Sequence, residues 1–166
     1  MPENKTRERA QRDKRQGKAP STQAGEYVHE EIEHVREGKH GARSAKQAIA
    51  IGLSKARRDG VDVPPPKKSA ASKATRRKAE HDLDAGHAHK RVSKPRSRAT
   101  SKALKREGSS AASKRALSTQ AHKAARKRTA SDRSAAAKKA ARTKGASGRS
   151  AAAKKAARTR ESHAGH

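Results

Sequence analysis

Clusters of lysine and arginine are the residues of this sequence whose type and spacing point most directly to a chemistry. Four short clusters occur between residues 76 and 158: Arg76, Arg77 and Lys78; Arg126, Lys127 and Arg128; Lys138, Lys139 and Arg142; and Lys154, Lys155 and Arg158. Cations held close to nucleic-acid phosphates release condensed counterions, which favours binding without reading base sequence. We therefore predict that these clusters contact phosphates, each residue adding a small share.

The positive charge is concentrated in the C-terminal part of the chain. Residues 1–63 hold 14 Lys/Arg and 10 Asp/Glu, whereas residues 64–166 hold 30 and 6, so most of the net charge of +28 lies after residue 63. Three prolines, Pro64 to Pro66, mark the border and stiffen the backbone there. The sequence thus predicts an N-terminal module (residues 1–63), a Pro-rich spacer (64–68) and a cationic tail (69–166).

A repeat runs through the end of this tail. The segment 133–144 recurs sixteen residues later at 149–160, with only the last residue changed, to Arg160. The unit contains no large apolar residue, so its copies cannot stack into a continuous core. A low-complexity basic tract is indicated, in which helix formation would place Lys138 and Arg142 on one face.

Metal and catalytic chemistry receive less support. The segment 81–89, HDLDAGHAH, contains metal-ligand residue types at close spacing, but nothing in the sequence fixes their geometry, so we interpret it as a solvated loop. The chain lacks cysteine and a glycine-rich phosphate loop, and no scaffold assembles a Ser/His/Asp set. We predict no metal site, no cofactor and no enzyme activity.

The N-terminal module shows helix signals. Residues 4–16 are rich in helix formers and precede Gly17, but they have no apolar stripe. Pro20-Ser21 opens a second helix with Ser21 or Thr22 as N-cap, whose apolar face holds Val28, Ile32 and Val35 and which ends at Gly38. Its five glutamates are interpreted as a solvated face, with docking on the basic tail or binding of another basic protein as the alternatives: Glu26, Glu30, Glu31, Glu33 and Glu37.

A third helix is predicted to begin at Ser44, where Gln47 completes a capping-box pattern. Its apolar face holds Ala45, Ile49, Leu53 and Ala56, and Gly60 follows its basic last turn. The second and third helices, joined by residues 38–41, make a helical hairpin. Its apolar faces are small, so self-association or a protein partner is expected to complete it through residues 22–58.

Composition determines the expected fold class. Only 30% of residues are hydrophobic and the single aromatic is Tyr27. Low hydrophobicity combined with high net charge leaves too little apolar surface to offset the entropy of folding. We therefore predict a mostly α protein, with a small N-terminal helical hairpin followed by a largely disordered, helix-prone basic tail.

One resemblance is carried by residues 37–58, which read EGKHGARSAKQAIAIGLSKARR. Together with the residues around them, over roughly 1–66, they resemble a family of small bacterial proteins of uncharacterised function. This resemblance implies a bacterial origin and brings no activity or catalytic residues. The tail is separately similar in composition to the Lys/Ala-rich tails of linker histones and bacterial histone-like proteins.

These features predict sequence-nonspecific DNA binding by a histone-like or nucleoid-associated protein. An RNA- or ribosome-associated protein is one alternative, since the same charge would serve it, and an interaction adaptor that binds a protein through the hairpin is another. The longest apolar run, residues 48–53, is far short of the ~20 residues of a membrane span, and no signal peptide is apparent. We expect a soluble protein of the bacterial cytoplasm, located on the nucleoid.

Overall fold

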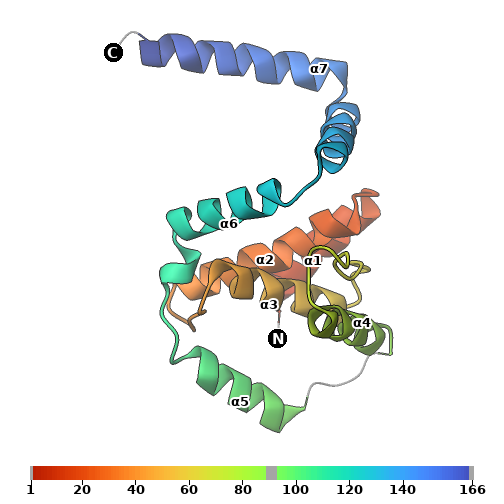
Figure 1. Cartoon of the computed structure of the whole chain (residues 1–166), viewed down its shortest axis with the longest axis vertical. Coiled ribbons are helices and arrows are strands. Elements are labelled where there is room, and N and C mark those ends of the chain that lie inside the picture. The colour runs from red at the N-terminus through yellow and green to blue at the C-terminus, as the bar shows by residue number, and fades with distance from the viewer. Residues whose placement is uncertain (1, 89–92, 165–166) are drawn as a thin grey trace. The chain divides into compact units, whose positions relative to one another are not determined.

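The computed structural model describes residues 2–88 and 93–164, and within them the chain forms helices and no strand (Figure 1). The chain divides into two compact units, Met1–Ala121 and His122–His166. The elements are α1 (Asn4–Arg15), α2 (Pro20–Arg36), α3 (Ala45–Arg58), α4 (Lys73–His87), α5 (Lys94–Leu104), the 3-10 turn η1 (Ser110–Ala112), α6 (Lys114–Arg126) and α7 (Ala130–Ala164).

The ends of the first three helices follow local signals in the sequence. Gly17, Gly38 and Gly60 each adopt a positive φ just after a helix, as the left-handed residue of a helix end requires. Ser44 caps α3 by accepting a hydrogen bond from the Gln47 backbone N–H at 3.2 Å. One predicted cap is wrong: α2 begins at Pro20 with Ala19 as its N-cap, because proline's fixed φ suits the first helical position.

The helical hairpin of α2 and α3 forms the centre of the first unit. Small residues of α3 make the contact, since Ala48, Gly52 and Ala56 recur every four residues and are buried. On α2 the residues facing inward include Ala24, Tyr27 and Val35, whereas the predicted Val28 and Ile32 are only partly buried. Short side chains therefore let the two helices approach closely.

Other segments of the same chain cover this hairpin. α1 packs on α2, and α4 packs on α3. The 3-10 turn η1 contacts both α2 and α3. Two buried apolar clusters result. One contains Ala10, Ala24, Tyr27, Ala56, Val61 and Val63, and the other contains Val35, Ala42, Ala48, Ala111 and Ala112. The core of the first unit thus contains residues from both sides of the predicted border at residue 63.

The expectation of a largely disordered tail is wrong. Residues 73–87, 94–104, 114–126 and 130–164 are helical. α4 is docked on α3 through Ala79, Asp82, Ala85 and Gly86, and a Cβ at Gly86 would collide with the Arg57 carbonyl. The expectation failed because it weighed average hydrophobicity, whereas alanine and lysine are strong helix formers and alanines can fill a closely spaced helix contact.

Two sets of polar contacts hold neighbouring segments against the C-terminal half of α3. Arg57, 6% exposed, donates to the carbonyls of Val63 at 3.0 Å and Pro64 at 3.2 Å, so the start of the predicted proline spacer lies against the end of α3. Burial lowers the pKa of this guanidinium. Asp82, 1% exposed, accepts from Arg58 Nε at 2.7 Å and Ser54 Oγ at 2.5 Å, which fixes α4 to α3.

The single tyrosine is the largest apolar group of the core. Tyr27 is 2% exposed, and its hydroxyl donates to Asp59 Oδ2 at 2.5 Å. Arg7 Nη2 lies 2.9 Å from the other oxygen of Asp59, so α1, α2 and the end of α3 meet at one carboxylate. Burial, followed by the hydrogen bond to Asp59, raises the pKa of the Tyr27 phenol well above its ordinary value of 10.0.

This raised pKa predicts that the protein loses stability at alkaline pH, and the absorbance of Tyr27 itself can be used to follow the loss. Above pH 10.0 the unfolded phenol loses its proton while the folded one keeps it, so stability falls as the pH rises further. Because Tyr27 is the only tyrosine, tyrosinate absorbance is expected to appear together with the loss of helical circular dichroism. In denaturant the same absorbance should titrate near pH 10. Tyrosinate forming near pH 10 with the helix signal intact would contradict the buried hydrogen bond.

Candidate nucleic-acid interface and a buried carboxylate–histidine cluster

The predicted phosphate-binding residues fall in both units. Arg76, Arg77 and Lys78 lie on α4 in the first unit, where Arg76 is half-buried and the other two are exposed. The other nine lie in the second unit and are all exposed: Arg126, Lys127, Arg128, Lys138, Lys139, Arg142, Lys154, Lys155 and Arg158. The structure therefore places these clusters at the surface, three residues in the first unit and nine in the second.

α7 carries the most concentrated charge. From Arg133 to Arg160 the chain has ten Lys/Arg and no Asp/Glu. Among the described side chains, none after Ala112 is buried, so these cations have no role in a core. Lys138 and Arg142 occupy one face of the helix, as do Lys154 and Arg158, in agreement with the predicted spacing.

The two copies of the repeat adopt the same local structure. Gly145, with φ 66° and ψ 177°, interrupts α7 between them, so each copy forms its own helical segment. Thr143 and Thr159, at equivalent positions, each donate a hydroxyl hydrogen bond at 3.0 Å to the carbonyl four residues earlier. The leading arginine of the second copy, Arg149, donates to the Ala141 carbonyl at 2.6 Å across the interruption. The second unit is thus a pair of similar cationic helices following the end of α6.

A further cationic surface was missed by the sequence interpretation. A shallow, open depression along α5 is lined by Ser97, Arg98, Ser101, Lys102, Lys105 and Arg106. α5 buries no side chain, and Arg98, Lys102 and Lys105 recur at helical spacing. That spacing is the signal that would have found it in the sequence.

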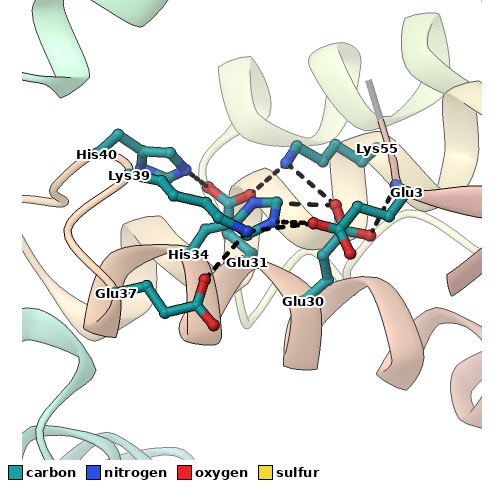
Figure 2. Close-up of polar contacts among 8 residues, drawn as sticks. All are labelled: Glu3, Glu30, Glu31, His34, Glu37, Lys39, His40 and Lys55. Carbon is teal, nitrogen blue, oxygen red and sulfur yellow. Dashed lines mark hydrogen bonds and ion pairs between the residues drawn. The ribbon is translucent and has the colours of Figure 1, made fainter. Parts of the chain in front are cut away.

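The glutamate-rich face of α2 is not fully solvated, which corrects that interpretation for two residues. Glu30 is 6% exposed and Glu31 is 0% exposed. Lys55 of α3 lies 2.5 Å from Glu31 Oε2, and Figure 2 shows its ammonium between the two carboxylates. Even so, neither oxygen of Glu31 nor Glu30 Oε1 accepts a hydrogen bond of ordinary geometry from any described residue.

Two histidines complete this cluster. His40 Nε2 lies 3.4 Å from Glu31 Oε1, while its Nδ1 lies 3.1 Å from the Gly41 carbonyl. His34 Nε2 lies 3.0 Å from Glu3 Oε1, and its Nδ1 lies 3.9 Å from Glu30 Oε1. The two rings contact edge to face, with centroids 6.1 Å apart. One ligand atom each from Glu31, His34 and His40 lies within 4.8 Å of the others, a spacing that a single metal ion can bridge.

Exposed charges surround the cluster. Hydrogen bonds from His34 and then Lys39 lower the pKa of the Glu3 carboxyl, and hydrogen bonds to Glu37 and then Glu3 raise the pKa of Lys39. Lys39 Nζ lies 3.0 Å from Glu37 and 3.2 Å from Glu3, so the start of the chain is tied to the α2–α3 connection (Figure 2).

The interpretation of residues 81–89 as a solvated loop is wrong for the described part of the segment, which is helical in α4 as far as His87. His81 and His87 are exposed, His87 pairs with Asp62 at 2.7 Å, and Asp82 is buried against Ser54 and Arg58. His89 lies outside the described residues. In the described part of this segment the metal-ligand residue types therefore do not converge.

Comparison with known proteins places part of the N-terminal half beside a family of unknown function. Residues 4–68 match the model of a family of unknown function (DUF6496), which agrees with the resemblance carried by residues 37–58. No curated protein and no solved structure matches the chain. None of the helices in residues 2–88 and 93–164 combines the length and the apolar character that crossing a membrane requires.

Proposed function

We propose that the protein is a non-enzymatic, sequence-nonspecific nucleic-acid-binding protein whose physiological target is DNA. The observation that carries this proposal is the run from Arg133 to Arg160, with ten exposed cations, no carboxylate and no buried side chain. An α-helix rises about 1.5 Å per residue, so each of the two helical copies presents one cation every ~4 Å, against one duplex charge per ~1.7 Å. Such a surface neutralises phosphates and lets duplex segments approach each other.

Base reading plays no part in this mechanism. Modules that read single-stranded nucleic acid stack bases on aromatic side chains, and the only aromatic of this chain is buried in the first unit. The cations of α4 and α5 add phosphate contacts from the first unit. A place on the bacterial nucleoid follows from this proposal, supported by the bacterial family that residues 37–58 resemble and by the histone-like composition of residues 69–166.

Two alternatives would replace this proposal: the physiological target is RNA, or the protein is an adaptor that binds a protein partner through the hairpin. The apolar faces of the hairpin within residues 22–58 are covered by α1, α4 and η1, which leaves less apolar surface for a protein partner. Binding of random-sequence DNA and of structured RNA at matched salt separates the two nucleic acids. If ~8–12 phosphates are contacted, log K against log salt should have a slope of about −7 to −11. A weak, salt-insensitive interaction would remove the proposal.

Each single substitution of a cation on α7 should weaken DNA binding by a similar small amount, whatever the DNA sequence. Lys139→Gln is expected to make the salt slope shallower by about one unit and to leave the preference among DNA sequences unchanged, because one phosphate contact is lost. Arg142→Lys keeps the charge and serves as the matched control, with an unchanged slope. A large loss of affinity for one DNA sequence alone would indicate base reading and contradict the mechanism.

A further inference from the structure

We propose that Glu31, His34 and His40 bind one divalent transition-metal ion, Zn²⁺ or an ion of similar ligand preference, with water in the fourth position. The site joins α2 to the connection before α3, and it is independent of the cationic surface proposed for nucleic acid. Imidazole and carboxylate groups in this number are the ligand set of four-coordinate zinc sites.

Burial is the first argument for a bound cation. Glu31 is 0% exposed and both of its oxygens lack an ordinary hydrogen bond, as does Glu30 Oε1. Native structures satisfy nearly all buried polar atoms, and an ionised carboxylate left without hydrogen bonds is costly. Lys55 Nζ forms an ion pair with Glu31 Oε2 at 2.5 Å, whereas the nitrogens paired with Glu31 Oε1 and Glu30 Oε1 lie 3.4 to 3.9 Å away. A cation between these oxygens and the two histidines would supply closer contacts.

Charge gives the second argument. Glu30 and Glu31 carry two negative charges, and among the side chains of residues 2–88 and 93–162 only the ammonium of Lys55 pairs with both, at 3.9 and 2.5 Å. Two carboxylates therefore share one ammonium group in a nearly closed site. A divalent ion would compensate both carboxylates. The Lys55 side chain is 24% exposed, so its ammonium can move to solvent when the ion binds.

The orientation of the histidines gives the third argument. The Gly41 carbonyl accepts a hydrogen bond from His40 Nδ1, so Nε2 is the ring nitrogen directed at Glu31 Oε1. Glu3 occupies one ring nitrogen of His34 in the same way, and Figure 2 shows both rings directed toward the two glutamates. Metal-binding histidines ordinarily hold their second nitrogen with a carboxylate or a backbone carbonyl. The groups that would hold the second ring nitrogen of each metal-binding histidine are thus already in place.

The experiment uses the full chain without a histidine tag, after treatment with a chelator. Titration with Co²⁺ is expected to give the visible absorption of four-coordinate cobalt, saturating at one equivalent and displaced by Zn²⁺. Zn²⁺ should also raise the melting temperature, since it binds only the folded state. His40→Asn is expected to lower the affinity at least about 100-fold, because a direct ligand should matter as much as the second-layer partners that cost 10- to 100-fold.

Two exposed histidines provide the controls. His87→Asn and His122→Asn lie outside the cluster and should leave affinity and stoichiometry unchanged. His34→Asn repeats the test if His40→Asn loses its helical circular dichroism. Loss of Co²⁺ binding in His87→Asn or His122→Asn would mean adventitious binding at exposed histidines and overturn the proposal. Unchanged Co²⁺ binding in both His40→Asn and His34→Asn would overturn it too. A wild-type chain that shows no four-coordinate cobalt spectrum would overturn it as well, leaving Glu31 in its ion pair with Lys55.

Discussion

Removing residues 129–166 is expected to weaken binding to random-sequence duplex DNA by about 10²- to 10³-fold at low salt and to make the salt slope several units shallower. The deleted segment holds ten of the 44 Lys/Arg, all exposed, and only two acidic residues. The cut falls between α6 and α7, and no buried side chain is described after Ala112. The helices around α2 and α3 should therefore remain folded.

A full-length variant distinguishes charge from the mere presence of the segment. Replacement of the same ten Lys/Arg by Gln keeps the length and the helix-forming residues, and it should reproduce the loss. Exchange of lysine for arginine within α7 keeps the charge and should leave affinity within about threefold. Fluorescence anisotropy with a labelled duplex across a range of salt measures all of them. Unchanged binding after removal of α7 would contradict the prediction and would indicate that the cations of α4 and α5 make the phosphate contacts.

The helix boundaries near the N-terminus were predictable because their signals are local. Glycine after a helix and serine before one act through their own backbone and side chain, and α1, α2 and α3 end or begin at such residues. The expected bounds 4–16 and the start at Ser44 agree with α1 and α3 within a residue. Only the cap of α2 was misassigned, where proline at the first position took precedence over Ser21 and Thr22.

Which faces are buried was harder to predict. Apolar size favoured Ile49 and Leu53, yet the centre of the α3 contact is made by Ala48 and Gly52, and the larger side chains lie at its edge. Packing by small residues is invisible to a count of large apolar groups. For the same reason the sequence did not predict that Ala111 and Ala112, far along the chain, would cover the hairpin.

The two candidate sites differ in how far the sequence could predict them. Surface cations were predictable because lysine and arginine rarely become buried, and eleven of the twelve predicted side chains are exposed. The carboxylate–histidine cluster was not predictable as a whole. Glu31 and His34 share a helix face at a spacing of three, but His40 comes from a connection and Lys55 from the next helix. Only the tertiary structure brings these groups together.

Gly52→Ala is expected to destabilise the protein, although alanine is the better helix former. A Cβ at Gly52 would lie 2.7 Å from the Val28 Cα and 3.0 Å from the Tyr27 carbonyl oxygen. These are backbone atoms of α2, so relief requires the two helices to separate, and such overpacking typically costs ~1–3 kcal/mol. The same substitution gains only about 1 kcal/mol of helix propensity, so the steric cost should prevail.

Gly25→Ala is the matched control. Gly25 is an exposed residue in the interior of α2, and a Cβ there would meet nothing within 4 Å. This substitution should therefore stabilise the protein by about 0.5–1 kcal/mol through helix propensity alone. Urea unfolding followed by far-ultraviolet circular dichroism measures the free energy of unfolding for both variants, and we expect them to shift the midpoint in opposite directions. A stabilising Gly52→Ala would show that α2 and α3 do not pack at this distance, because the helix-propensity gain would then be unopposed.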